Sequence, residues 1–272
     1  MGESTDYRPG VYRPEVYRTS VYHSVRPALE RLAALLLLVA LSPLIGLLVV
    51  LIRLTSKGPG IYSQTRLGRG GAIFTMYKLR SMRLDAESKT GPVWAAVGRD
   101  PRVTPLGHWL RRSHLDELPQ LYNILRGEMS LIGPRPERPA IAAVLADAIP
   151  DYLDRLRVLP GVTGLAQINL PPDTDLNSVR AKLQLDLEYI RRADWWLDIR
   201  IAACTLLRLV GLRGGRAVSW LGLHRSVDLG AIPAAAGAHC QLAVVISADE
   251  VSPAEEPAPL HPADTAMAAS PG

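Results

Sequence analysis

Cysteine is scarce in this sequence of 272 residues, which contains only Cys204 and Cys240. Their separation matches neither the close pairs that bind zinc nor a disulfide framework, so we expect two ordinary small residues in a reducing cytoplasm. The chain also lacks a G-x-G-x-x-G fingerprint and a regular alternation of strands and helices. A dinucleotide-binding sheet is therefore disfavoured.

Charged residues are absent from Leu32 to Ile52, a run of 21 residues. As a straight helix this run would be about 31 Å long, which is enough to cross a bilayer. Mostly polar residues precede it, and no A-x-A-like cleavage site follows it. We therefore expect a retained membrane segment rather than a signal peptide.

Ser42 and Pro43 interrupt the centre of this apolar run. Pro43 cannot donate a hydrogen bond to the carbonyl of Val39, but the Ser42 hydroxyl can reach that carbonyl. A kink is therefore tolerable inside the membrane. Basic residues flank both ends of the run, so the positive-inside rule gives a spanning helix no direction. The residues alone leave a spanning and a re-entrant helix equally open.

The net charge is +5 and the isoelectric point about 9.4, a balance that suits nucleic acid, anionic lipid or a phosphorylated small molecule. The lysines and arginines cluster near the apolar run and near one polar motif. No recognised nucleic-acid-binding pattern accompanies them, so we expect no nucleic-acid partner.

Composition divides the chain into four parts. A five-residue repeat with tyrosine and arginine contains proline and glycine and should not pack, and the C-terminal end is rich in alanine and proline. We expect a disordered tail over 1–25, a membrane-embedded helix, break and helix over 26–57, a folded domain over 58–213, and a mostly disordered tail over 214–272.

The folded part is predicted to be a small α+β domain on the membrane anchor. Alternation around glycines predicts a hairpin over 61–80, and "LPQLYNILRG" predicts a helix that ends at Gly127. Other expected elements are a helix in 106–112, a helix over 137–158 that is interrupted near Pro150, a turn and short strand over 160–169, and helices over 178–192 and 195–210.

The densest polar segment runs from Arg111 to Pro139 and contains the adjacent acids Asp116 and Glu117. Because Pro119 fits only the first turn of a helix, we expect a helix that begins at about Glu117 with Asp116 as its N-cap. A carboxylate there stays ionised, and a phosphate could bind nearby. The alternative is that Asp116 is only a cap.

More cations surround these acids than a solvated surface needs. Arginine presents a planar fork to phosphate oxygens, whereas lysine acts as a point charge. "GPRP" holds Arg135 between two prolines, which stiffens the backbone that presents it. Phosphate chemistry is the natural inference from this group, which comprises Lys78, Arg80, Arg83, Arg111, Arg112, Arg135 and Arg138.

Four long motifs resemble, in order and spacing, the bacterial sugar transferases, which are monotopic polyprenol-phosphate phosphoglycosyl transferases. The motifs are "SQTRLGRGGAIFTMYKLRSMRLDAE", "DPRVTPLGHWLRRSHLDELPQLYNILRGEMSLIGPRPERP", "LPGVTGLAQIN" and "LDLEYIRRADWWLDIRI". The resemblance covers about residues 26–213. It implies transfer of a sugar phosphate from a UDP-sugar to a polyprenyl phosphate such as undecaprenyl phosphate, with release of UMP. The lipid-linked product would begin a surface polysaccharide or another exported glycan.

The resemblance also implies roles for single residues. Asp116 matches the nucleophile that forms a phosphosugar-aspartyl intermediate. Glu117 matches the second acid of the pair, which is associated with Mg²⁺. Arg111 and Arg135 match phosphate-binding arginines. For Lys78 and Arg80, phosphate binding and a structural ion pair are both open.

For the membrane segment, the resemblance implies a re-entrant helix that breaks at Ser42 and Pro43. Both ends would then lie on the cytoplasmic face of the inner membrane, where nucleotide sugars are made. A further expectation comes from Trp195 and Trp196, which begin a helix that either lies in the headgroup region or packs in the core.

Some features depart from the family pattern or compete with it. His114 stands where many members carry Ser or Thr, and it is either a proton relay or an ordinary histidine. Residues 170–179, "LPPDTDLNSV", replace a more usual sequence, so the sugar is not identified; their D-x-D is too short to signal a metal. A non-catalytic membrane adaptor of a glycan-assembly complex is the alternative function, and a homo-oligomer is left open.

Overall fold

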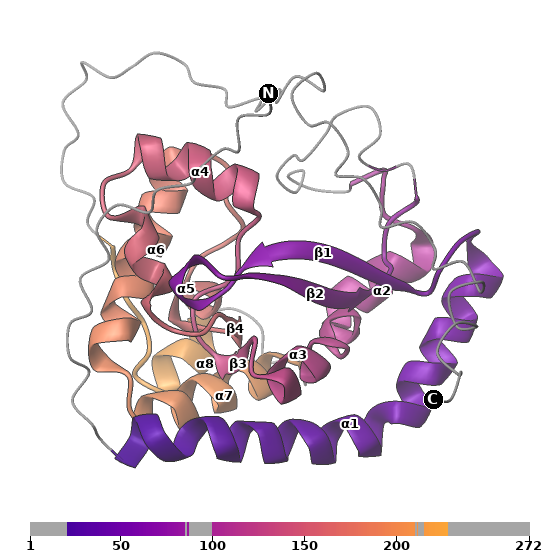
Figure 1. Cartoon of the computed structure of the whole chain (residues 1–272), viewed down its shortest axis with the longest axis horizontal. Coiled ribbons are helices and arrows are strands. Elements are labelled where there is room, and N and C mark those ends of the chain that lie inside the picture. Colours follow the sequence, from indigo (N-terminus) through magenta and orange to yellow (C-terminus); the bar gives the residue numbers. More distant parts are fainter. Residues whose placement is uncertain (1–20, 85, 87–99, 210, 212–214, 228–272) are drawn as a thin grey trace, which may run out of the picture.

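The computed structural model describes residues 21–84, 86, 100–209, 211 and 215–227. Cys240, the first twenty residues of the expected N-terminal tail, and residues 228–272 of the expected C-terminal tail lie outside the described residues. The described part is a mixed α and β fold with a long apolar helix at its N-terminal end, as predicted (Figure 1).

Helix α1 runs from Val21 to Thr55 and continues through Pro43. The predicted hydrogen bond from the Ser42 hydroxyl to the Val39 carbonyl is present at 2.8 Å. Figure 1 shows that the helix bends and does not separate into two helices. The expected tail over 1–25 also ends earlier than predicted, because residues 21–25 are helical and the Tyr22 side chain is buried.

Strands β1 (Ile61–Leu67) and β2 (Ile73–Leu79) form the predicted antiparallel hairpin, with Ile61 opposite Leu79 and Leu67 opposite Ile73. A 3₁₀ turn, η1 (Arg69–Gly71), connects them, and the positive φ angles of Gly70 and Gly71 explain why glycine occupies this turn. The even-numbered residues Phe74 and Met76 of β2 point into the core.

Helices α2 (Pro105–Ser113) and α3 (Gln120–Arg126) follow, with the 3₁₀ turn η2 (Leu115–Glu117) between them. Gly127 ends α3 at a φ of 77°, as predicted. The buried Asn123 of α3 accepts a hydrogen bond from the Tyr77 backbone N–H at 3.1 Å and donates one to the Thr75 carbonyl at 2.7 Å. Its amide therefore continues the strand pairing of β2 and fixes α3 against the hairpin.

The next segment contains strand β3 (Ser130–Ile132), helix α4 (Pro139–Ala148), the 3₁₀ helix η3 (Tyr152–Arg157), strand β4 (Gly161–Thr163) and helix α5 (Leu165–Asn169). Strands β3 and β4 are parallel neighbours. The predicted interruption of the helix near Pro150 is confirmed. The predicted turn and strand at 160–169 is right only for β4, because residues 165–169 form a helix.

Helices α6 (Leu176–Arg192) and α7 (Trp195–Leu209) agree with the sequence prediction, and α8 (Gly215–Trp220) follows them. Their contact surface includes Tyr189, Ile201 and Cys204. Ala217 of α8 and Leu223 are completely buried in the same cluster. Residues 215–227 therefore belong to the folded domain, although the sequence analysis assigned them to the tail.

One face of α1 packs along the rest of the fold. Ala34 lies among side chains of β2 and α3, while Leu48 and Ile52 contact Leu79 and Leu110. The opposite face exposes a row of large apolar side chains. It comprises Leu29, Leu32, Leu35, Leu36, Val39, Leu47, Val50, Leu51 and Leu54.

Candidate functional site

The two adjacent acids lie in the tight turn between α2 and α3. His114 ends α2 in the left-handed conformation, with a φ of 54°, and the chain then forms the single 3₁₀ turn η2. The prediction that Asp116 caps a helix is wrong, because α3 begins only at Gln120 and its N-cap is Pro119. The turn instead buries Asp116, whose exposed fraction is 7%.

Glu117 holds two of the predicted cations. Its Oε1 atom accepts hydrogen bonds from Lys78 Nζ at 2.8 Å and from Arg135 Nη2 at 2.9 Å. Burial would raise the pKa of Glu117, but Arg135 and Lys78 more than offset that effect and hold the pKa well below its usual range. Glu117 is therefore ionised at neutral pH, and it joins β2 to the loop after β3.

The groups around Asp116 shift the pKa of its carboxyl group in opposite directions. Burial and the negative charge of Glu117 raise its pKa above the usual range, while Lys78, Arg111 and Arg135 oppose this rise. Arg111 comes from the last turn of α2, and its Nε donates a hydrogen bond to Ser81 Oγ at 2.8 Å. The structure thus gathers Asp116, Glu117, Lys78, Arg111 and Arg135, as the sequence predicted.

Arg80 has a different environment from these five residues. Its Nη2 donates to the Ser56 carbonyl at 2.9 Å and to Ser56 Oγ at 2.8 Å, and its Nη1 donates to the Lys57 carbonyl. These atoms lie at and just beyond the C-terminal end of α1, where helical carbonyls lack partners within the helix. The contacts of Arg80 thus favour the structural alternative over phosphate binding.

The structure also shows where His114 and the D-x-D motif lie. His114 is exposed at the end of α2. In the D-x-D, Asp175 caps α6 by accepting from the Ser178 N–H at 2.7 Å, and Asp173 forms an ion pair with Lys182 at 2.9 Å. Both acids of that motif therefore support the start of α6.

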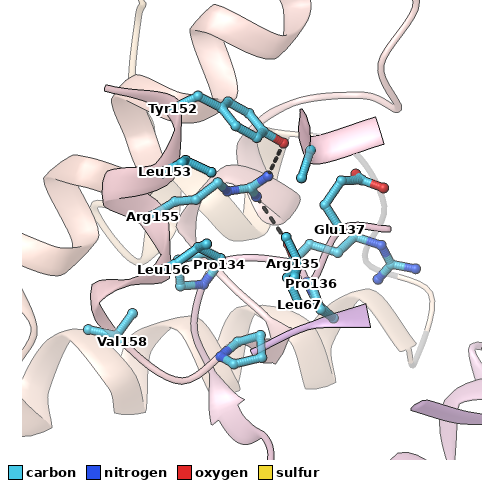
Figure 2. A pocket seen from close by; sticks show the side chains of 12 residues that line it. Leu67, Pro134, Arg135, Pro136, Glu137, Tyr152, Leu153, Arg155, Leu156 and Val158 are labelled. Carbon is cyan, nitrogen blue, oxygen red and sulfur yellow. Dashed lines mark hydrogen bonds between the residues drawn. The ribbon is translucent and has the colours of Figure 1, made fainter. Parts of the chain in front are cut away.

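Sequence analysis missed a buried group of residues beneath the "GPRP" loop (Figure 2). Arg155 donates to Tyr152 Oη at 2.7 Å, to Asp186 Oδ2 at 2.7 Å and to the Arg135 carbonyl at 3.0 Å. A cavity of about 10 Å³ lies beside these residues, which is room for about one water molecule. In the sequence, Arg155 belongs to the charged stretch "DRLR", which is typical of a surface, and nothing local marks it as buried.

The acidic pair fits Mg²⁺ only together with a phosphorylated ligand. Within the described residues, no group of three or more His, Cys, Asp and Glu side chains converges on one point. Mg²⁺ commonly takes one or two carboxylates and completes its shell with phosphate oxygens and water. Glu117 and Asp116 could supply those carboxylates, although Lys78 and Arg135 already occupy one oxygen of Glu117.

The chain is similar in sequence to several curated proteins. An undecaprenyl-phosphate glucose phosphotransferase of Komagataeibacter xylinus is 45% identical over 189 residues, covering 66% of this chain and 35% of that protein. A UDP-glucose:undecaprenyl-phosphate glucose-1-phosphate transferase of Xanthomonas campestris pv. campestris is 40% identical over 184 residues, covering 67% of this chain and 38% of that protein. The exopolysaccharide production protein PSS of Rhizobium leguminosarum bv. phaseoli is 37% identical over 188 residues, covering 67% of this chain and 94% of that protein.

The matched segment therefore spans little more than a third of the first two relatives. The family described as "Bacterial sugar transferase" matches residues 21–211, which include α1, both acids and the three cations that surround them. On this match over most of its length, the chain belongs to the bacterial sugar transferase family.

Proposed function

We propose that this protein transfers a sugar 1-phosphate from a UDP-sugar to a polyprenyl phosphate such as undecaprenyl phosphate. The single observation that carries the proposal is the buried Asp116, placed beside Glu117 and surrounded by Lys78, Arg111 and Arg135. A carboxylate among fixed cations can approach a diphosphate that would otherwise repel it. The names of the relatives point to the same substrate classes.

The proposed reaction has two displacements at one phosphorus atom. A carboxylate oxygen of Asp116 attacks the phosphate next to the sugar, the bond to the bridging oxygen breaks, and UMP leaves with that oxygen. An oxygen of the polyprenyl phosphate then attacks the same phosphorus, and the Asp116 carboxylate is released. Two steps let two anionic substrates use one site in turn.

The surrounding residues assist by binding charge. Arg111 and Arg135 would hold the diphosphate oxygens with their planar donor groups, and Lys78 would add a point charge close to Asp116. Mg²⁺, held by Glu117 together with phosphate oxygens, would supply further neutralisation of the leaving UMP. Glu117 also keeps Arg135 oriented through the 2.9 Å hydrogen bond.

The attachment of α1 supports a membrane arrangement with both helix ends on the same side. Near its start, Tyr22 Oη donates to Asp198 Oδ2 at 2.8 Å, and near its end Arg80 binds Ser56. One folded domain thus holds both ends, and a domain on one side of a bilayer cannot hold the two ends of a spanning helix. We infer a re-entrant α1 with its ends facing the cytoplasm, where UDP-sugars are available.

Helices α7 and α8 would rest in the headgroup region beside α1. Trp196, Ile199 and Leu206 form an exposed apolar stripe on α7, and Trp220 of α8 is exposed as well. The ring of Trp195 contacts that of Tyr22, with centroids 5.2 Å apart, so α7 begins next to the start of α1. Exposed tryptophans on amphipathic helices are typical of interfacial segments.

One assay tests the proposal against the adaptor alternative. UMP release is measured with polyprenyl phosphate, Mg²⁺ and a panel of UDP-sugars that includes UDP-glucose, for which a relative is named. Asp116→Ala should lose roughly 10³-fold or more in rate, because it removes the attacking group. Asp173→Ala, a matched acid in an ion pair with Lys182, should keep the wild-type rate. Equal rates for wild type and Asp116→Ala would refute the catalytic proposal.

A further inference from the structure

The loop that presents Arg135 is held from outside by donors on other elements. Two of its residues are prolines, which have no N–H and so cannot donate backbone hydrogen bonds within the loop. Nevertheless, each of four consecutive carbonyls accepts a hydrogen bond. The donors are Gly161 N to Pro134 O at 2.8 Å, Arg155 Nη2 to Arg135 O at 3.0 Å, Arg66 Nη1 to Pro136 O at 3.0 Å, and Leu67 N to Glu137 O at 2.9 Å.

Two of these donors are arginine side chains that are themselves fixed. Arg155 forms an ion pair with Asp186 of α6 at 2.7 Å, and the side-chain exposed fractions are 11% and 3%. Its guanidinium also lies over the Tyr152 ring, 5.2 Å from the centroid. Arg66 of β1 is held by Gln64 Oε1 at 2.6 Å and by Glu137 Oε1 at 3.1 Å. Each arginine therefore has little freedom to move.

Arg155 and Arg66 contact the backbone of the loop, whereas the substrate would be bound by the side chain of Arg135. Arg155 reaches the backbone of residue 135 from η3, and the Arg135 side chain points away from Arg155 (Figure 2). That side chain donates a hydrogen bond to Glu117. The Arg135 carbonyl is thus held by Arg155 and its guanidinium by Glu117, so both ends of the residue are restrained. Misplacement of a substrate-binding group by about 1 Å can cost on the order of 10²-fold in rate.

We propose that Arg155 and Arg66 are positioning residues that fix the backbone of Arg135 so that its guanidinium meets the diphosphate of the UDP-sugar. The proposal rests on the proposed function, in which Arg135 binds phosphate oxygens. It assigns no contact with substrate to Arg155 or Arg66. It requires instead that their effect on substrate binding pass through Arg135.

A double-mutant cycle tests this requirement. Arg155→Met should lower kcat/KM for the UDP-sugar by about 10–100-fold and weaken UDP binding by a similar factor. In an Arg135→Ala background the same substitution should have almost no further effect, because the side chain that it positions is gone. Arg157→Gln is the matched control, since Arg157 lies in the same η3 turn but pairs with the half-buried Asp154 at 2.8 Å.

The proposal would be overturned if Arg155→Met lowered kcat/KM and UDP affinity by the same factor in both backgrounds. It would also be overturned if the effect of Arg155→Met were no larger than that of Arg157→Gln. If Arg155→Met does not fold, Arg66→Met enters the same cycle, because Arg66 holds the next carbonyl from β1. UDP affinity is measured by calorimetry on the full chain in detergent for all variants. If the wild type releases no UMP, the proposed function fails. The double-mutant cycle in UDP affinity would then still test whether Arg155 positions Arg135.

Discussion

Burial and the charge of Glu117 raise the pKa of Asp116, and three cations oppose that rise. The balance matters for the proposed reaction, in which only the ionised Asp116 carboxylate could attack phosphorus. A nucleophile with a raised pKa works above that pKa and loses activity as the pH falls through it. Partial desolvation is also what makes such a carboxylate reactive, since water no longer shields it.

Lys78→Met should therefore move the acid side of the pH profile to higher pH. Lys78 is one of the cations that lower the pKa of Asp116, so its removal raises that pKa further. The measurement is kcat/KM for UMP release as a function of pH, compared with Lys182→Met, which removes a lysine that pairs with Asp173. An acid limb that stays in place, or moves to lower pH, would contradict the electrostatic account of Asp116.

Arg80→Met should reduce stability without weakening UDP binding. The substitution removes the hydrogen bonds to the half-buried Ser56 carbonyl and to the Lys57 carbonyl near the end of α1, at a cost of roughly 0.5–1.5 kcal/mol per hydrogen bond. For the folded protein, the Kd for UDP should stay within about twofold of wild type. Arg83→Met, at an exposed position three residues later, serves as the control in both chemical unfolding and calorimetry. A large loss of UDP affinity with unchanged stability would restore Arg80 as a phosphate ligand.

At the scale of elements, a buried polar cluster joins the start of α1 to α6 and α7. Asp198 of α7 accepts hydrogen bonds from Tyr22 Oη at 2.8 Å and from Tyr189 Oη at 2.9 Å, and it forms an ion pair with Arg26 at 3.0 Å. Arg26 also donates to the Ile132 carbonyl, directly before the "GPRP" loop. The membrane helix is therefore attached to the same short strand that leads into the site.

Tyr22→Phe should lower the free energy of unfolding by about 1–3 kcal/mol, because it removes a hydrogen bond to a buried carboxylate. The effect should appear as a lower denaturation midpoint in detergent, with the m-value unchanged. Ser24→Ala, at an exposed position one half-turn away on the same helix, should leave the midpoint in place. If the two variants are equally stable, the cluster does not anchor α1.

The elements that could be predicted have local signals. Alternation around glycines predicted the β1–β2 hairpin, glycine predicted the end of α3 at Gly127, and helices were expected where α6 and α7 lie. Most of the site could be predicted as well, since Lys78, Arg111, Asp116, Glu117 and Arg135 are brought together. Their proposed role in phosphate chemistry rests on the arginines and acids that lie together in one motif.

What could not be predicted depends on contacts between distant segments. Proline rules placed Asp116 at a helix N-cap, but the left-handed His114 inserts a separate 3₁₀ turn. Ala217 and Leu223 enter the core although their surroundings in sequence are typical of a tail. Arg155 is buried only because Asp186, 31 residues later, returns beside it on α6. No local pattern carries that information.

At the scale of the whole molecule, the fold connects the site to the surface that would meet lipid. The exposed face of α1, the apolar stripe of α7 and Trp220 are the large apolar surfaces of the described residues, and Figure 1 shows α1 running beneath α7 and α8. In the proposed reaction, the polyprenyl phosphate would remain in the membrane throughout. A domain that holds both ends of α1 could receive that phosphate without the lipid leaving the bilayer.

This arrangement predicts that both ends of α1 react from the cytoplasmic side. Single cysteines are introduced as Ser24→Cys and Lys57→Cys, both at exposed positions, in a chain with Cys204→Ala and Cys240→Ser. A membrane-impermeant maleimide should label neither cysteine in intact cells and both in inverted vesicles, because one domain holds both helix ends through Asp198 and Arg80. A cysteine introduced at Ser226, in the folded domain, reports the cytoplasmic side in the same vesicles. Labelling at position 24 in intact cells, with position 57 protected, would mean that α1 spans the bilayer and that its contacts at one end do not form in the membrane.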